Sequence, residues 1–231
     1  MLTNHRRAFW YALALLIVMA AVFLAVGRHP AADAPATSVP FVGRWDLTVF
    51  HAMDDIRSTP LTWLARGLNV LGGGVVTIPL RALVGLWLVF RRRWLALGTW
   101  LLTWVGAEVL LEVAKRYFHR GRPPGALVAT SGFSFPSGHA VAGAATALAL
   151  VLVLLSEGPA RRRWELAAVA FAFVMASSRV YLDAHWLSDV VAGVLLGTGV
   201  ALGSAAVATE VRDIKMRRRA RANAPADEPG G

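Results

Sequence analysis

Long apolar segments recur along the chain, and they constrain its fold more than any other feature. A helix of about twenty apolar residues spans the hydrocarbon core of a bilayer and satisfies its backbone hydrogen bonds within itself. Hydrophobic residues make up 56% of the chain, which favours lipid over water as its solvent. We therefore predict an all-α protein, a polytopic membrane bundle with six transmembrane helices. The expected crossings are residues 8–27, 74–90, 94–114, 138–156, 165–182 and 190–209.

The first of these segments, residues 8–27, contains no charged residue and follows Arg6 and Arg7. A cleaved signal peptide has a shorter apolar core, of roughly 7–15 residues. We therefore expect a retained anchor, and either interpretation leaves the later topology unchanged.

The basic residues fall in short clusters between the apolar segments and give the chain a formal net charge of +10. The clusters are residues 6–7, 91–93, 161–163 and 212–221. Because Lys and Arg are enriched in cytoplasmic loops, this pattern places both termini in the cytoplasm and the polar segments 115–137 and 178–189 outside. We thus expect the active site at the outer membrane face. Nucleic acid is not expected as a partner, because the charges form no single soluble basic face.

Residues 1–211 form one membrane domain in this prediction, and residues 212–231 follow as a basic tail that ends in Pro, Ala, Asp and Glu. A segment of this composition buries too little apolar surface to fold, so we expect the tail to be disordered. The chain has no cysteine, which excludes a thiolate nucleophile, a disulfide framework and a cysteine metal site.

Between the first two crossings, apolar residues recur every three positions at Leu47, Phe50 and Met53. This spacing predicts a short helix from Trp45 to Arg57 that lies along the outer interface. Such a helix could cover a lipid opening or serve only as an interfacial spacer.

Arg81 lies inside the second crossing, where an unpaired cation is costly. We expect its side chain to face the bundle. Glu108, inside the third crossing, is the expected partner.

His185 and Asp189 stand next to apolar segments and are four residues apart. On a helix they share one face, so the carboxylate can hold one ring nitrogen. The other nitrogen is then free to act as a nucleophile or general base. Taken alone, the two residues could equally form a helix-capping pair at the membrane surface.

Four cations follow the third crossing, on the side where the topology does not favour positive charge. They are Lys115, Arg116, Arg120 and Arg122. Guanidinium and ammonium groups suit a phosphoryl group, whose oxygens accept several charge-assisted hydrogen bonds. Attraction to anionic lipid headgroups is the alternative for this loop alone.

Ser137, Gly138 and His139 open the fourth crossing. A helix N-terminus presents free backbone N–H groups, glycine permits close approach and serine supplies a hydroxyl, so a phosphate oxygen can dock there. A helix cap followed by an interfacial histidine is the plainer alternative.

Together the three segments read K-x6-R-P from Lys115, P-S-G-H from Pro136, and S-R-x5-H-x3-D from Ser178. In these motifs the chain resembles the type 2 phosphatidic acid phosphatase superfamily of membrane lipid phosphatases, which shares its site with vanadium-dependent haloperoxidases and bacterial acid phosphatases. The resemblance covers Lys115 to Asp189 by motif, and most of the chain by its six-crossing layout.

By this resemblance His185 is the nucleophile, Asp189 orients it and His139 is the general acid. The resemblance assigns the phosphate to a cradle of Lys115, Arg122, Ser137, Gly138 and Arg179. It implies no metal and no other cofactor, because the cations of the cradle neutralise the phosphoryl oxygens. The motifs leave five nearby polar residues without a role: Arg116, His119, Arg120, Tyr181 and Asp183. We expect His119 and Arg120 to face solvent in the loop; contact with the substrate is the alternative.

The resemblance implies a metal-independent lipid phosphate or pyrophosphate phosphatase of a bacterial plasma membrane, acting through a phosphohistidine intermediate. Candidate substrates are undecaprenyl pyrophosphate, phosphatidic acid and phosphatidylglycerol phosphate. A lipid phosphotransferase would use the same residues with a hydroxyl as the acceptor, and a non-catalytic lipid-binding membrane protein is the alternative from another class. The oligomeric state stays open, because Gly193 and Gly197 could pack helices within one subunit or between two.

Overall fold

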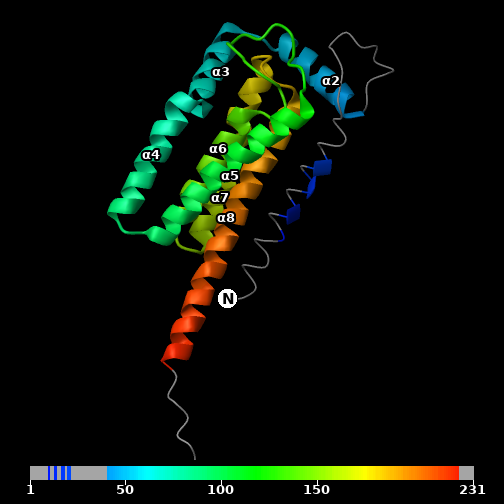
Figure 1. The fold of residues 1–231 in the computed structure, drawn as a ribbon. Coiled ribbons are helices and arrows are strands. Elements are labelled where there is room, and N and C mark those ends of the chain that lie inside the picture. Colours follow the sequence, from blue (N-terminus) through cyan, green and yellow to red (C-terminus); the bar gives the residue numbers. More distant parts are fainter. Residues whose placement is uncertain (1–9, 11–12, 15–16, 19, 22–40, 224–231) are drawn as a thin grey trace, which may run out of the picture.

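Helices make up the described part of the chain, apart from its loops and turns (Figure 1). The structure, a computed structural model, describes residues 41–223 together with residues 10, 13–14, 17–18 and 20–21. Among these residues there is no strand, so the prediction of an all-α fold is confirmed. The helices of residues 41–223 are α2 (Phe41–Asp55), α3 (Thr59–Gly72), α4 (Gly74–Phe90), α5 (Trp94–Phe118), α6 (Gly138–Leu154), α7 (Pro159–Tyr181) and α8 (Leu187–Ala222). The crossing predicted at 8–27 lies outside the described residues except for the few positions named above.

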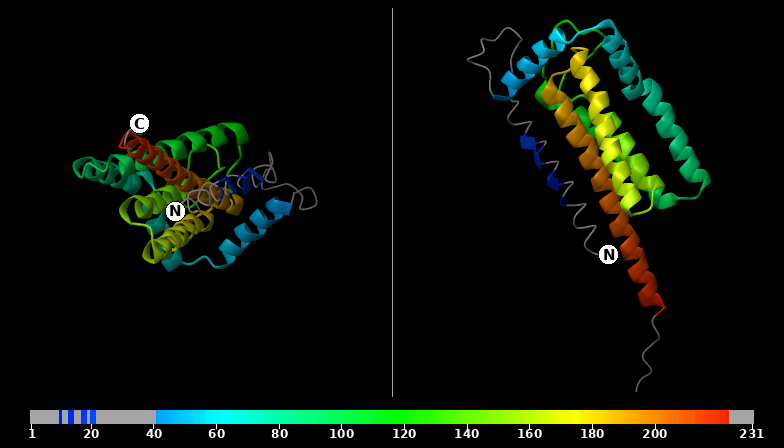
Figure 2. Two further views of the ribbon diagram at one scale, coloured as in Figure 1. Left: turned by 90° about the horizontal axis from the view of Figure 1, so that it is seen from below. Right: turned by 180° about the vertical axis from the view of Figure 1, so that it is seen from behind.

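Helix α6 packs against α5, α7 and α8 and forms the centre of the bundle (Figure 1 and Figure 2). Its small side chains let the neighbouring helices come close. A Cβ atom on Gly193 would lie 2.7 Å from the carbonyl oxygen of Ser137, and one on Gly197 would lie 2.5 Å from that of Val141. These two glycines therefore pack α8 against α6 within one subunit.

Helices α3 and α4 form an apolar arm along one side of the bundle (Figure 1). They are separated at Gly73, whose extended backbone (φ −79°, ψ 164°) ends α3 and begins α4. A Cβ atom on Gly72 would lie 2.3 Å from the sulfur of Met175, so the junction packs directly on α7. Together the two helices cover Thr59–Phe90, which begins well before the predicted crossing at 74–90 because α3 is also apolar.

Arg81 of α4 has the partner that the sequence predicted. Its Nη1 donates to Oε1 of Glu108 at 2.8 Å, and its Nε donates to Oγ1 of Thr146 at 2.8 Å. The Arg81 side chain is 2% exposed, whereas that of Glu108 is 48% exposed. The buried cation is therefore both paired and hydrogen-bonded, as burial of a charge requires.

Three helical segments of the described chain are long and apolar enough to cross a membrane: Thr59–Phe90, Trp94–Phe118 and Leu187–Ala220. Helix α6 is a shorter apolar helix. Helix α8 differs from the prediction, because it continues through the basic residues to Ala222 and extends past the bundle (Figure 1). Residues 212–222 of the tail are thus helical rather than disordered. Lys, Arg, Met and Ala are good helix formers, and cations near a helix C-terminus interact favourably with the helix dipole.

Candidate active site

The residues predicted for the site lie at one end of the bundle, although they come from separate segments. Lys115 lies at the end of α5, and Arg122 lies in the loop that follows. Ser137, Gly138 and His139 lie at the start of α6, and Arg179 lies at the end of α7. His185 lies in the loop before α8, and Asp189 lies in the first turn of α8. The backbone N–H of Ser137 donates to the carbonyl oxygen of Asp189 at 3.0 Å. Nη1 of Arg122 lies 3.1 Å from Nε2 of His185. The three sequence motifs therefore meet in space.

His185 lies in the loop between α7 and α8 and is 3% exposed. Its Nδ1 lies 3.4 Å from Oδ2 of Asp189, and its Nε2 lies 3.1 Å from Nη1 of Arg122. Because arginine only donates, Nε2 accepts, and the partners place the ring proton on Nδ1. Burial lowers the pKa of His185 to about 4; Asp189 acts in the opposite direction, while Arg122 and Arg179 add to the lowering. At neutral pH the ring is thus uncharged, with the lone pair of Nε2 facing the cations.

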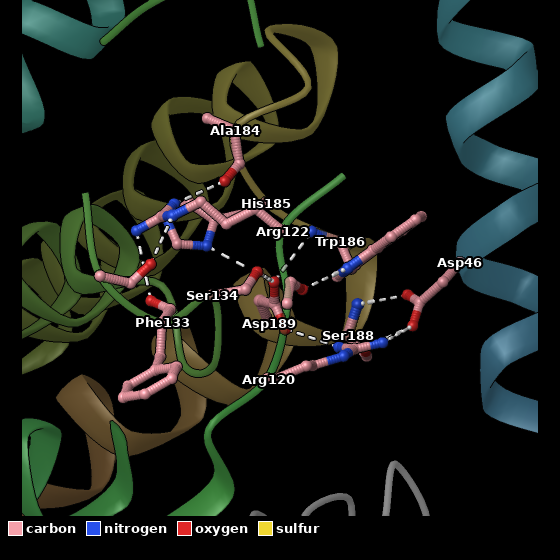
Figure 3. Close-up of polar contacts among 12 residues, drawn as sticks. Asp46, Arg120, Arg122, Phe133, Ser134, Ala184, His185, Trp186, Ser188 and Asp189 are labelled. Carbon is pink, nitrogen blue, oxygen red and sulfur yellow. Dashed lines mark hydrogen bonds and ion pairs between the residues drawn. The ribbon is translucent and has the colours of Figure 1, made fainter. Parts of the chain in front are cut away.

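Asp189 is fully buried in the first turn of α8. Its Oδ1 accepts from Nη1 of Arg120 at 2.6 Å. Its Oδ2 accepts from the backbone N–H of Trp186 at 2.9 Å and from the hydroxyl of Ser134 (Figure 3). A carboxylate held by this many donors stays charged and keeps one orientation.

Arg120 does not face solvent, which corrects the sequence-based expectation. It is 7% exposed and bridges two carboxylates. Besides the bond to Asp189, its Nη2 donates to Oδ2 of Asp46 at 2.6 Å. Asp46 also accepts from the backbone N–H and the hydroxyl of Ser188, at 2.8 and 2.7 Å. Figure 3 shows Asp46 reaching from its own helix towards Arg120 and Ser188. His119, by contrast, is exposed and starts the loop in a left-handed conformation (φ 46°).

Asp46 belongs to α2, the helix that the sequence assigned to the outer interface, and the motifs did not indicate it. It is 2% exposed. It lies four and seven residues before Phe50 and Met53, on the apolar face of the helix. A carboxylate on an apolar face is the sequence signal that could have identified it, since a buried charge requires a partner. Which partner it has depends on a contact more than seventy residues away in sequence.

Tyr181 and Asp183, which the motifs also left without a role, bind the connection between α2 and α3. Nη2 of Arg57 donates to Oδ2 of Asp183 at 2.6 Å. The backbone N–H of Ser58 donates to the hydroxyl of Tyr181 at 3.0 Å. These contacts fix α2 and α3 to the end of the bundle that holds His185.

Arg122 holds the loop that surrounds the site. Its guanidinium donates to the carbonyl oxygens of four residues, at 2.7–3.2 Å: Ala184, Ser131, Gly132 and Phe133. It makes no ion pair with a carboxylate among the described residues, and burial lowers its pKa. Arg122 thus binds neutral backbone groups, and the negative charge of Asp189 acts on it only at longer range.

Two further cations surround the same space. Arg179, 3% exposed, donates through Nη1 to the side-chain oxygen of Asn69, and its buried Nε has no partner. Lys115 is half-buried and lies within electrostatic range of Arg122. Neither cation forms an ion pair in the described part of the chain. Cations that gather in this way without carboxylates repel one another, which an anionic ligand would relieve.

His139 and Ser137 complete this space at the N-terminus of α6. His139 is within electrostatic range of Arg179, His185 and Arg122, and its ring faces the backbone carbonyl of Asn69. The buried hydroxyl of Ser137 has no hydrogen-bond partner. Asn69, near the end of α3, is a second residue that the motifs did not indicate, although an amide in an apolar helix just before three glycines was a visible signal.

No group of three or more His, Asp or Glu side chains gathers closely enough to hold a metal ion among the described residues. The polar groups that could receive a ligand are therefore the cations, the free hydroxyl of Ser137 and the N-terminus of α6. This set of donors suits a phosphoryl group.

An all-helical bundle with apolar helices and a cluster of cations beside a buried histidine is suited to a membrane protein that binds a phosphoryl group. Comparison with known proteins gives the family: the profile of the PAP2 superfamily matches residues 93–213. The chain belongs to this superfamily and is a phosphatase.

Three relatives show how far the similarity extends. The chain is 32% identical to phosphatidylglycerophosphatase B of Bacillus subtilis over 152 residues, which cover 62% of this chain and 72% of the relative. It is 30% identical to an undecaprenyl-diphosphatase of Sulfolobus acidocaldarius over 164 residues, 68% of this chain and 75% of the relative. The crystal structure of a transmembrane PAP2 type phosphatidylglycerolphosphate phosphatase from Bacillus subtilis superposes with a TM-score of 0.72 and 26% identity, covering 90% of this chain and 98% of the other.

Proposed function

We propose that the protein is a metal-independent lipid phosphate phosphatase that works through a phosphohistidine on His185. One observation carries the proposal: the buried ring of His185 lies with Nδ1 3.4 Å from Oδ2 of Asp189 and presents Nε2 to cations that form no ion pair with a carboxylate in the part of the chain that the structure describes. A neutral imidazole beside an uncompensated positive site is suited to attack a phosphorus atom whose oxygens those cations bind.

The reaction has two steps. Nε2 of His185 attacks phosphorus, and the bond from phosphorus to the leaving oxygen breaks as His139 gives that oxygen a proton. Water then attacks the phosphohistidine, returns its proton to His139 and releases inorganic phosphate, which restores the lone pair of Nε2. Asp189 stabilises the positive charge that the His185 ring carries while phosphorylated.

Lys115, Arg122 and Arg179 neutralise the phosphoryl oxygens, and the transition state gains more from them than the ground state does. In the present structure Nη1 of Arg122 occupies the lone pair of His185 Nε2 at 3.1 Å. A bound phosphoryl group takes over that donor and frees Nε2 for attack. Ser137 and the first turn of α6 supply hydroxyl and backbone N–H donors for a further oxygen.

The substrate that we propose is an amphiphile with a terminal phosphate or pyrophosphate. The named relatives act on phosphatidylglycerophosphate and undecaprenyl diphosphate, and both molecules join a phosphate group to long apolar chains. Phosphatidic acid belongs to the same class. Lipid tails fit a site that lies at one end of helices with apolar outer faces, such as α3 and α4.

The proposal includes an orientation in the plasma membrane. Three consecutive arginines stand at 91–93, between α4 and α5, and again at 161–163, near the start of α7. His185 follows the other end of α7, so both arginine clusters lie at the opposite end of the bundle from it. By the positive-inside rule that end faces the cytoplasm, together with both termini, and the site faces outward.

The test is phosphate release by the purified protein in detergent with EDTA, from phosphatidylglycerol phosphate, phosphatidic acid and undecaprenyl pyrophosphate. We expect turnover of at least one of them, and a loss of at least ~10³-fold in His185→Ala. His119→Ala, which removes an exposed histidine of the neighbouring loop, should stay within about twofold of wild type. Turnover that requires added metal, or that survives in His185→Ala, would refute the proposal. Incorporation of heavy oxygen from labelled water into the released phosphate separates hydrolysis from transfer to another hydroxyl.

A further inference from the structure

Helices α2 and α3 each send one polar side chain into the site, although both precede the three motifs and the segment matched by the family profile. Asp46 of α2 reaches Arg120 and Ser188, and Asn69 of α3 reaches Arg179 and faces His139. Neither residue is within the motifs that carry the chemistry. Asp46 lies behind Arg120, which binds Asp189, and Asn69 lies behind Arg179.

Asp46 balances the charge of Arg120. Arg120 is buried between Asp46 and Asp189, at 2.6 Å from each. With both carboxylates present, the group of three carries one net negative charge, which remains available to the ring of His185. Without the charge of Asp46, Arg120 would be compensated by Asp189 alone, and Asp189 would stabilise a phosphorylated, positively charged ring less well.

Asn69 fixes the opposite side of the site. Its side-chain oxygen accepts from Nη1 of Arg179, and its backbone carbonyl faces the ring of His139. A Cβ atom on Gly73 would lie 3.5 Å from Nε2 of His139, so the end of α3 packs directly on that ring. One short segment thereby sets the distance between a phosphate-binding cation and the proton donor.

We propose that α2 and α3 are working parts of the active site: Asp46 positions His185 through Arg120 and Asp189, and Asn69 positions Arg179. Neither residue touches the phosphoryl group. The proposal rests on the proposed function. It predicts that the two residues affect different kinetic constants, because His185 forms the covalent bond and Arg179 binds the phosphoryl oxygens.

The first test is a kinetic cycle of Asp46→Asn and Arg120→Gln, with Asp55→Asn as the matched control. Asp55 lies on the same helix and is exposed. We expect Asp46→Asn to lower kcat roughly 10- to 100-fold at nearly unchanged KM, as loss of an orienting carboxylate partner does elsewhere. Because Asp46 acts through Arg120, it should cost little further kcat once Arg120→Gln is present. Losses that multiply, or an Asp46→Asn enzyme as fast as Asp55→Asn, would overturn the assignment.

The second test keeps the proposal open to refutation if the buried variants do not fold. Asn69 is only partly buried, and Asn69→Ala should raise KM several-fold while kcat changes less; Leu71→Ala, an exposed position of the same helix, is the control. An unchanged KM in Asn69→Ala would remove Asn69 from the proposal. In both tests, wild-type turnover that is lost in His185→Ala establishes the proposed function independently, so the two failures are distinguishable.

A second observation concerns the other end of the bundle. A groove of about 780 Å³ lies there between the α4–α5 turn, the α6–α7 turn and α8. Its charged lining consists of five cations and one carboxylate: Arg92, Arg93, Arg161, Arg212, Lys215 and Glu157. Apolar side chains such as Trp94, Leu152 and Val153 line the same groove. Of the five cations, Arg161 and Arg212 have carboxylate partners, at 2.7 and 3.9 Å.

We infer that this groove binds the anionic headgroup of a membrane phospholipid. Five cations in one concave space concentrate positive potential and attract a phosphodiester. The apolar lining suits the first part of an acyl chain, which a free phosphate ion does not possess. Helix α8 contributes Arg212 and Lys215 to one wall of the groove.

Native mass spectrometry of the delipidated protein tests this inference with added phosphatidylglycerol, phosphatidylcholine or inorganic phosphate. We expect selective retention of phosphatidylglycerol, and its loss in Arg93→Gln with Lys215→Gln. The control is Arg218→Gln with Arg219→Gln, which makes the same charge change further along α8, outside the groove, and should retain the lipid. Equal retention of both lipids, equal loss in both double variants, or retention of phosphate alone would each overturn the inference.

Discussion

Two charged clusters lie on opposite sides of His185, and they differ in what surrounds their cations. In the support cluster, Arg120 is buried between Asp46 and Asp189 at 2.6 Å from each. The cations of the cradle are Lys115, Arg122 and Arg179; Arg122 and Arg179 donate to carbonyl and amide oxygens, and none of the three forms an ion pair with a carboxylate among the described residues. The difference indicates which cations serve structure and which are available to a ligand, because only a charge without a counter-charge attracts an anion strongly.

The difference follows from the cost of burial. A guanidinium that is removed from water needs a hydrogen-bond acceptor for each of its N–H groups. Carboxylates supply such acceptors together with the opposite charge. Carbonyl oxygens satisfy the same N–H groups but leave the net charge in place. The cradle is therefore less stable without its ligand than the support cluster is, and that difference favours binding of a phosphoryl group.

The largest effect that separates the clusters is on stability. Arg120→Gln leaves Asp46 and Asp189 as buried carboxylates without their cation, so we expect a loss of about 3–5 kcal/mol of unfolding free energy. The melting temperature of the detergent-solubilised protein measures this. Arg116→Gln, on an exposed arginine 4.0 Å from its carboxylate partner, is the control and should change it little. A melting temperature equal to that of the control would show that the two clusters do not differ in this way.

The cradle should show the reverse pattern. Arg122→Gln removes a positive charge that interacts with the phosphoryl oxygens, so kcat/KM should fall roughly 10²- to 10³-fold. Stability should fall less than in Arg120→Gln, because the repulsion from Lys115 and Arg179 is relieved at the same time. Activity and melting temperature of the same preparation give both numbers. If Arg122→Gln destabilised the protein as strongly as Arg120→Gln, the distinction between the clusters would be lost.

The pKa of His185 shows whether Asp189, which raises it, or burial and the cradle cations, which lower it, have the larger effect on the ring. Burial lowers the pKa of His185 to about 4, against roughly 6.5 in an unfolded chain. Between these values the unfolded state binds more protons. Stability from the neutral ring is therefore fully present above about pH 6.5 and is lost as the pH falls towards 4. The melting temperature of wild type should decline over this range more steeply than that of His185→Gln. A stability that declines with rising pH instead would mean that Asp189 outweighs burial and the cradle.

Arg81 and Glu108 provide a comparison within the membrane-embedded helices, with the smallest expected effect. This pair joins a buried cation to a half-exposed carboxylate at 2.8 Å, and Thr146 and the carbonyl oxygen of Ala142 also accept from the arginine. A double-mutant cycle of Arg81→Ala and Glu108→Ala should give a coupling of about 1 kcal/mol in unfolding free energy. Additive losses would mean that the pair contributes nothing as a pair.

The same two clusters show how far the sequence could go. The resemblance named the residues proposed for the cradle, and the structure brings them to one end of the bundle; their role in binding phosphate stays a prediction. The sequence predicted only part of the support cluster. Asp189 was predicted, Arg120 was expected to face solvent, and Asp46 was not singled out. The buried state of Arg120 depends on two contacts with residues about seventy positions away in opposite directions, and no local periodicity encodes a contact of that kind.

The helices show the same division. The length and hydropathy of the segments predicted the all-α bundle, and the cost of an unpaired charge predicted the partner of Arg81. The junction at Gly73 lies in a run of three glycines, but its contact with His139 became evident only in the packed structure. The prediction for the end of α8 was wrong because composition alone suggested disorder. Good helix formers instead continue a helix that the bundle has already nucleated.

The most direct test of the account is to trap the covalent intermediate. Wild-type protein is mixed with a lipid phosphate labelled on its terminal phosphorus, quenched in alkali, which preserves phosphohistidine, and analysed by peptide mapping. The account predicts label on His185 within the first turnover, and none in His185→Ala. Rapid phosphate release with no label on His185, or with the label on another residue, would contradict the assignment of His185 as the nucleophile.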